Sequence, residues 1–136
     1  MSFTYNLFIS HSWTYGDVYD KLVSMLDSRS YFPYRNYSVP KNDPIHNAPN
    51  QQLLYDAIKR QITLCHVIII PAGIYSSYSK WIDKEIAISK RDFKKPILAI
   101  EPWGSQRASR IVTDAADLVV GWNTESIISG IRKISI

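Results

Sequence analysis

Four short apolar runs constrain the fold of this chain more than any other feature. They cover residues 5–10 (YNLFIS), 65–71 (CHVIIIP), 96–101 (PILAIE) and 117–121 (DLVVG). Strands that are apolar along their whole length are typical of a parallel sheet that helices cover on both faces. Segments with a helical apolar period alternate with these runs, at residues 17–27, 51–62, 80–91 and 124–133. We therefore expect an α/β fold.

The segment at residues 31–49 differs from the rest because it carries four prolines. It is expected to form a long ordered loop that contains one short strand, at residues 37–39. Together with the four apolar runs this strand gives five parallel strands, and we predict a flavodoxin-like doubly wound sheet in the order 2-1-3-4-5. Sheets of this kind bind ligands at the carboxyl ends of their strands. With 136 residues, the chain is expected to form a single domain, residues 1–136.

Composition excludes several classes of protein. No apolar run approaches the roughly 20 residues of a membrane span, and the amino terminus does not resemble a signal peptide, so we predict a soluble, cytoplasmic protein without a membrane partner. Cys65 is the only cysteine and is expected in the core, which excludes an internal disulfide and a cysteine-based metal cluster. We predict no metal site. The net charge is +4, but the basic residues are spread along the chain, so no nucleic-acid partner is expected.

Glu85 is the most informative single residue. At about 100° per residue it falls near the centre of the apolar face of the helix predicted at residues 80–91. Burying a carboxylate is costly unless it is paired or hydrogen-bonded. Either a partner such as Arg35, Lys41 or His11 neutralises Glu85, or Glu85 faces a cleft that a ligand fills. The apolar residues of this face are Tyr78, Trp81, Ile82, Ile86, Ile88 and Phe93.

Polar residues follow the predicted strands where a ligand would bind. Ser10, His11 and Ser12 come directly after the first strand, where they would meet a phosphate or ribose or merely end the strand. The loop after the third strand leads into the helix of Glu85. The remaining candidates each have a structural alternative. Trp81 would form either a cleft wall or part of the core. The loop residues Tyr37, Lys41 and Asp43 would either contact the substrate or pack the loop.

Three segments resemble TIR domains. Residues 5–12 (YNLFISHS) resemble their opening strand, which typically reads Tyr-Asp-Val-Phe-Ile-Ser before polar residues. Residues 79–86 (SKWIDKEI) resemble the segment in which a Trp precedes by four residues the glutamate of NAD-cleaving members. Residues 37–44 (YSVPKNDP) look like the loop after the second strand in TIR-like proteins of Thoeris antiphage systems. The chain departs from the usual pattern because Ile82 replaces a Cys and the loop lacks a Pro-Gly pair.

The resemblance implies an NAD+ glycohydrolase of the ADP-ribosyl cyclase type. Such an enzyme would release nicotinamide and make a cyclic ADP-ribose isomer that activates a partner effector, and it would self-associate through TIR–TIR contacts when active. NAD+ would be the substrate, with no cofactor and no metal. The resemblance assigns catalysis to Glu85 and substrate binding to Ser10, His11, Ser12, Tyr37, Lys41, Asp43 and Trp81.

Two other functions stay open. A non-catalytic TIR adaptor would use the same loops to bind another TIR surface. A nucleoside deoxyribosyltransferase-like enzyme would need further carboxylates at the strand ends, for which Asp43, Glu101 and Asp114 are the candidates. A phosphoacceptor receiver domain is disfavoured, because the first strand ends in Ser10 and His11 where an acidic pair would be required.

Overall fold

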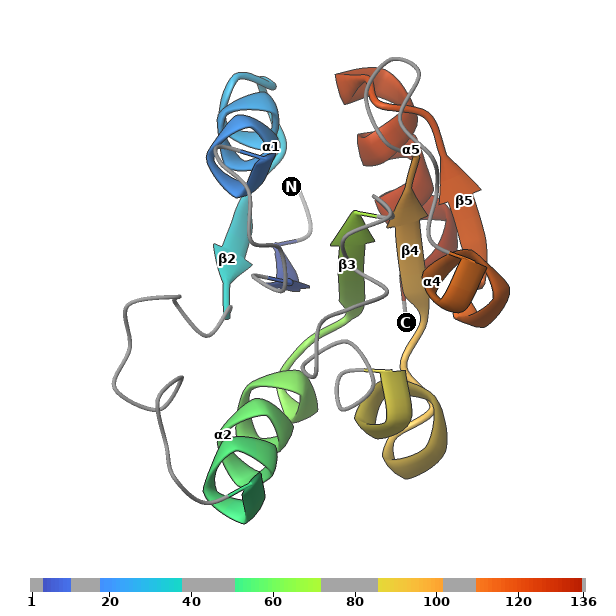
Figure 1. The fold of residues 1–136 in the computed structure, drawn as a ribbon. Helices are drawn as coiled ribbons and strands as arrows, with labels where there is room; N and C mark the ends of the chain where they lie inside the picture. Colours follow the sequence, from blue (N-terminus) through green and yellow to red (C-terminus); the bar gives the residue numbers. More distant parts are fainter. Residues whose placement is uncertain (1–3, 11–17, 38–50, 72–85, 102–109, 136) are drawn as a thin grey trace.

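The described residues form one five-stranded parallel sheet with helices on both faces (Figure 1). The computed structural model describes residues 4–10, 18–37, 51–71, 86–101 and 110–135. Every strand pair is parallel and the order is β2-β1-β3-β4-β5. The predicted doubly wound, flavodoxin-like α/β fold and its strand order are therefore confirmed. The strands are β1 (Tyr5–Ile9), β2 (Tyr34–Asn36), β3 (Val67–Pro71), β4 (Ile97–Ile100) and β5 (Leu118–Val120).

The position predicted for the second strand is wrong. The pattern places it at residues 37–39, whereas β2 pairs Tyr34–Asn36 with residues 5–7 of β1. The centre of the Phe32 ring lies 5.5 Å from that of Tyr5, on which it stacks, and 5.9 Å from that of Tyr34. These aromatic contacts favour pairing of β2 with β1 from Tyr34 onward, three residues before the predicted start. The last pairing bond described runs from the Tyr37 N–H to the Leu7 carbonyl (2.9 Å). The sequence pattern missed this strand because it is short and lacks a long apolar run.

Side chains of the central strands alternate between two cores, one on each face of the sheet. Phe8, Ile68 and Ile97 belong to the first core, together with residues of α2 (Gln51–Thr63), η3 (Ala87–Asp92) and α4 (Arg110–Ala115). We call this side the α2/η3 face. Leu7, Ile69 and Leu98 belong to the second core, with α1 (Val18–Asp27) and α5 (Thr124–Ile134). This second side is the α1/α5 face, and Figure 1 shows its two helices together, away from α2 and η3.

Most helices lie where the apolar period predicts them. Helices α1, α2 and α5 match their predicted ranges to within one residue at each end. At the start of α5, the Asn123 side chain accepts a hydrogen bond from the Ser126 N–H (2.8 Å) and satisfies one of the free amide groups of the first turn. Helix α4 was not predicted, because six residues with Val112 as the buried contact are too short to show a period.

Helix α5 approaches the sheet closely at one glycine. Gly130 is buried, and a Cβ atom at this position would lie 3.0 Å from Leu98 Cδ1 and 3.1 Å from Val120 Cγ1. Contacts this short are tighter than ordinary packing, so a side chain of any size would push the helix outward. The absence of a side chain at Gly130 therefore sets how near α5 lies to β4 and β5. None of the helices in the described ranges is long and apolar enough to cross a membrane.

Candidate functional site

Ser10 lies where the sequence predicts a polar site residue, at the carboxyl end of β1. It is fully buried, and its N–H donates to the carbonyl of Ile69 in the neighbouring strand (2.9 Å). A buried hydroxyl is rare without a hydrogen-bonding or functional reason. The structure therefore places one predicted candidate at the sheet edge where ligands of this fold bind. Its proposed contact with substrate stays a prediction.

Tyr37 follows the carboxyl end of β2, the strand next to β1. Its backbone bonds to Leu7, and its half-buried side chain packs against the core of the α2/η3 face. Ser10 comes three positions after Leu7, so it lies roughly 7–10 Å further along the sheet than the backbone level of Tyr37. Packing accounts for the position of the Tyr37 ring, and a substrate contact of this residue remains a prediction.

The helix that follows Glu85 packs against the sheet as its sequence predicts. Ile88 is fully buried, and Ile86 and Phe93 pack against the core of the α2/η3 face. Arg91 is exposed and Lys90 is half-exposed, so these charged side chains reach solvent. The apolar side predicted for this helix is therefore confirmed over residues 86–93, which immediately follow Glu85.

This helix ends in a π conformation that the α-helical period does not predict. Residues 87–92 form η3, and the Phe93 N–H donates to the carbonyl of Ile88, five residues earlier (3.1 Å). A π turn is rare and occurs frequently at functional sites, because it widens the helix and turns side chains that an α-helix would space differently. The described part of the helix predicted at residues 80–91 is therefore helical, but its hydrogen bonds are those of a π-helix and not of an α-helix.

Ser89 is a buried polar residue that sequence reasoning missed. It is fully buried within η3, and its carbonyl accepts a hydrogen bond from the Lys95 N–H (2.6 Å). The spacing of Ser89 could have predicted its burial. Ser89 follows Ile86 by three residues and Glu85 by four, so the helical period places it on the apolar face. Serine is small and polar, and for that reason it does not register in an apolar pattern.

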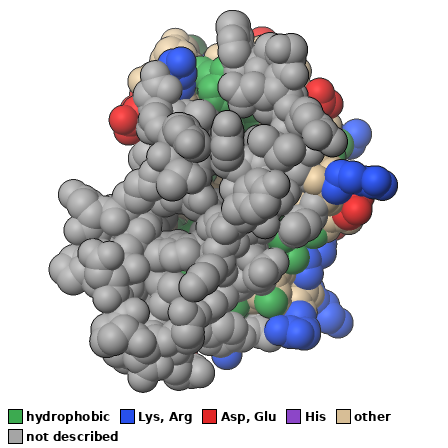
Figure 2. Space-filling model, viewed as in Figure 1, with side chains coloured by type: hydrophobic (Ala, Val, Ile, Leu, Met, Phe, Trp, Pro, Cys, Tyr) green, Lys and Arg blue, Asp and Glu red, His purple; other side chains and the backbone are tan. Residues whose placement is uncertain are grey.

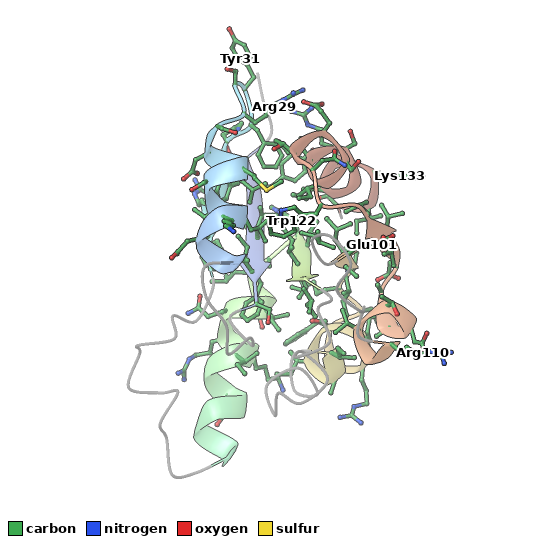
Figure 3. All side chains as sticks on the ribbon, turned by 45° about the horizontal axis from the view of Figure 1, so that its top comes forward. Arg29, Tyr31, Glu101, Arg110, Trp122 and Lys133 are labelled. Atoms are coloured by element: carbon green, nitrogen blue, oxygen red, sulfur yellow. The ribbon has the colours of Figure 1, made fainter. Side chains whose placement is uncertain are left out.

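Two further residues follow the carboxyl ends of β4 and β5. Glu101 is exposed, and its N–H donates to the carbonyl of Val120 (2.8 Å). Trp122 is partly buried and packs into the core of the α1/α5 face, and Figure 3 shows it between these two helices. The Trp122 ring is therefore a packing residue at the edge of the sheet, while Glu101 presents a carboxylate to solvent.

Six of the predicted site residues lie outside the described residues, and their roles stay predictions. They include the proposed catalytic carboxylate and most of the proposed substrate contacts: Glu85, His11, Ser12, Lys41, Asp43 and Trp81. Within the ranges that the structure describes, no group of three or more His, Cys, Asp or Glu side chains is arranged to hold a metal ion.

Cys65 is a core residue, as predicted. It is buried at the end of α2, where its Sγ lies 3.2 Å from the carbonyl of Gln61. Burial raises the pKa of the thiol to about 12, although the nearby Lys95 acts in the opposite direction. A thiol with such a pKa remains protonated at neutral pH, so Cys65 is not a nucleophile.

His66 connects the starts of β1 and β3 at the edge opposite the candidate site. The Asn6 N–H donates to His66 Nδ1 (2.8 Å), and the His66 N–H donates to the Asn6 carbonyl (2.7 Å). Burial lowers the pKa of His66, and the positive charge of Lys95 lowers it further. The folded protein therefore favours the neutral imidazole, whose Nδ1 can accept the hydrogen bond.

We predict that His66 makes the folded protein less stable in mild acid. Because its pKa is lower in the folded state, the unfolded chain binds the proton more readily, and stability falls as pH decreases through about 6.5. Protonated Nδ1 cannot accept from Asn6, which removes a hydrogen bond worth about 1 kcal/mol. Urea unfolding at pH 7 and pH 5 measures this loss. The variant His66→Asn keeps an acceptor but does not titrate, so its loss between the two pH values should be smaller. An equal loss in both proteins would contradict the role given to His66.

The arrangement of the strands defines the class of this domain. Five parallel strands in the order 2-1-3-4-5 are those of a flavodoxin-like domain, a fold that binds ligands at the carboxyl ends of its strands. A buried serine follows β1, and a long connection follows β2. The family model of the Thoeris protein ThsB, TIR-like domain, matches residues 8–107. The chain belongs to this family, and it is therefore a TIR-like domain of the Thoeris antiphage defence.

The comparisons with solved structures and with curated proteins do not assign a family. A solved structure described as the crystal structure of a prokaryotic SEFIR domain is similar to this chain, with 14% sequence identity and a TM-score of 0.49. The similarity covers 95% of this chain and 94% of the SEFIR domain chain. No curated protein sequence matches the chain.

Proposed function

We propose that this protein is an NAD+-cleaving TIR enzyme of the glycohydrolase or ADP-ribosyl cyclase type. The observation that carries the proposal is the ThsB family match, because residues 8–107 include Glu85 and every predicted substrate contact. The described part of the Glu85 helix supports it, since Ile86 and Ile88 pack against the core on the face to which the period also assigns Glu85. A carboxylate on such a face needs a partner or a ligand.

The proposed chemistry requires one carboxylate. Nicotinamide leaves NAD+ without needing a proton, and the barrier lies in the positive charge that develops on the ribose. Glu85 would stabilise this oxocarbenium-like ribose and orient it through hydrogen bonds to the ribose hydroxyls. NAD+ is the substrate in this scheme, and neither a metal nor a further cofactor takes part.

The remaining candidates would hold the substrate in place. Ser10, His11 and Ser12 would meet the phosphate or ribose at the end of β1, and Lys41 would neutralise the pyrophosphate. Trp81 would form a wall of the cleft, with Tyr37 and Asp43 contributing from the loop. A cleft closed in this way would exclude water, so that a group of the same ADP-ribose attacks the ribose and a cyclic product forms.

The proposal also includes the partners of the domain. The cyclic product would diffuse to a partner effector and activate it, and the domain would act in the cytoplasm. Assembly through TIR–TIR contacts would accompany activity. This arrangement needs no direct contact between the domain and its effector.

Product chromatography tests the proposal. The pure protein and extracts of phage-challenged cells that express it are incubated with NAD+, and the products are separated. We expect nicotinamide together with a cyclic ADP-ribose isomer. A folded protein that self-associates but releases no nicotinamide in either setting would favour the adaptor function. Release of free base from nucleosides, with NAD+ intact, would favour a deoxyribosyltransferase-like enzyme.

A further inference from the structure

Six basic residues belong to two stretches of sequence that pack against each other on the α2/η3 face. They are Lys59, Arg60, Lys90, Arg91, Lys94 and Lys95, and we call them the basic surface. Two contacts join the stretches: Lys95 Nζ donates to the carbonyls of Thr63 (3.2 Å) and Cys65 (2.8 Å), and Lys59 Nζ lies 5.8 Å from the centre of the Phe93 ring. Figure 2 shows Lys and Arg side chains gathered at its lower right, over η3.

The basic surface carries the excess charge of the protein. Residues 59–66 and 90–95 contain six Lys or Arg and one Asp. The whole chain contains 16 Lys or Arg and 12 Asp or Glu. The rest of the chain therefore has ten basic and eleven acidic residues and is close to neutral. The excess of basic over acidic residues, which gives the isoelectric point of about 9.2, thus lies in these two stretches of sequence.

Some of these cations have structural roles. Lys95 donates to the carbonyl of Thr63, the last residue of α2, and to that of Cys65, and Lys90 pairs with Asp117 at 2.5 Å. Burial would raise the pKa of Asp117, but its bonds to Lys90 and to the Ile97 N–H (2.8 Å) outweigh this effect and lower it. Cations at the ends of helices also interact favourably with the helix dipole. The folded structure therefore accounts for Lys90 and Lys95 without any partner.

Three cations of the basic surface have no such side-chain partner. Arg60 and Arg91 are in the last turns of α2 and η3, where the helix dipole favours a positive charge but leaves it exposed. Arg60, Arg91 and Lys94 are exposed, and among the described residues their side chains have no hydrogen-bond or ion-pair partner. Lys94 lies outside the helices and adopts a φ of 53°, in the left-handed region that glycine takes without strain. This conformation follows the end of η3, where the Lys95 N–H donates to the Ser89 carbonyl, and it leaves the Lys94 side chain exposed. These three side chains are available to an anionic partner.

We propose that the basic surface binds the phosphate backbone of nucleic acid without reading its sequence. A domain with an isoelectric point above about 9 and Lys and Arg clustered on one face has the electrostatic footprint of such binding. A protein partner would need an apolar centre. Leu64, which is 52% exposed, is the only large exposed apolar side chain that the structure describes in these stretches, and it supplies too little apolar area.

The location of the basic surface separates it from the candidate site. Lys94 and Lys95 precede β4, so they lie at the amino-terminal edge of the sheet, whereas Ser10 follows the carboxyl end of β1. Bound nucleic acid would leave the carboxyl edge open. The inference is thus independent of NAD+ cleavage, although it changes the expectation, drawn from the spread of basic residues in the sequence, that nucleic acid is not a partner.

Fluorescence anisotropy with labelled DNA tests the inference. The full chain is titrated into a duplex of about 20 base pairs and a single-stranded RNA of similar length, at salt concentrations from about 50 to about 200 mM. We expect a dissociation constant on the order of 10⁻⁵ M at the lowest salt. The slope of log K against log salt should be about −2.7, because three free cations each contribute roughly 0.9.

Matched variants locate the binding. Arg60→Gln combined with Arg91→Gln should weaken binding roughly tenfold and make the salt slope less steep by about 1.8. Lys21→Gln combined with Lys133→Gln removes the same charge from α1 and α5 and should leave the slope unchanged. Thermal unfolding of both double variants checks that they fold. The inference is overturned by no binding at low salt, by equal weakening in both double variants, or by binding to anionic lipid vesicles but to neither nucleic acid.

Discussion

Replacing Glu85 with Gln is expected to lower the rate of nicotinamide release from NAD+ by about 10² to 10³-fold. The substitution keeps the shape of the side chain and its hydrogen-bonding capacity. It removes the negative charge that, in the proposed function, stabilises the developing ribose cation. Removing one preorganised electrostatic group of an active site typically costs a factor of this size. The measurement is the turnover of NAD+ by chromatography, at saturating substrate and under the conditions in which the wild type is active.

A matched control separates this role from a general change in charge. Glu101→Gln removes an exposed carboxylate that follows the carboxyl end of β4, and the variant should retain most of the activity. Both variants should unfold at temperatures close to that of the wild type. Unchanged turnover in Glu85→Gln would contradict the proposed function. Loss of activity in both variants would instead favour a site with two carboxylates, as expected of a deoxyribosyltransferase-like enzyme.

Replacing Gly130 with Val is expected to have the largest effect on stability. The first added atom would lie 3.0 Å from Leu98 Cδ1, 3.1 Å from Val120 Cγ1 and 3.4 Å from Leu118 Cδ2, and valine adds two methyl groups beyond it. Overpacking of this kind costs about 1–3 kcal/mol. The added atoms would force α5 away from β4 and β5. Urea unfolding measures the change in the free energy of unfolding.

Ser129→Val is the matched control for this prediction. Ser129 precedes Gly130 in α5 but is exposed, so the same β-branched side chain meets solvent instead of the sheet. We expect a change of no more than about 0.5 kcal/mol. If both variants lost the same stability, helix propensity would explain the effect, and the close approach of α5 to the sheet would not.

The parts of the fold that depend on long apolar patterns could be predicted from the sequence. The runs around Phe8, Ile69 and Leu98 are buried on both faces of the sheet, and no soluble surface strand would tolerate such a composition. The predicted position of β2 was wrong because its pairing depends on contacts such as that of Phe32 with Tyr5, which links residues far apart in sequence. Tertiary contacts of this kind leave no local pattern.

Prediction of the candidate site met similar limits. The spacing of Ile86, Ile88 and Phe93 gave the correct buried side of the helix after Glu85, because that side packs against the core. The π conformation was not predictable, since it reflects hydrogen bonds chosen by packing and not by residue preference. The basic surface escaped prediction for a different reason: Arg60 and Arg91 are separated by thirty residues of chain, and only the packing of α2 beside η3 joins them.

The π conformation of η3 has a consequence for comparing this protein with its relatives. A π turn contains one residue more than an α turn, so η3 behaves like a single-residue insertion absorbed within a helix. A relative with a regular α-helix here would lack one residue between Ile86 and Phe93, yet its loops could have the same lengths. An alignment without a gap in that segment would displace either Glu85 or β4 by one position. The catalytic assignment of a relative therefore depends on placing that gap within residues 87–92.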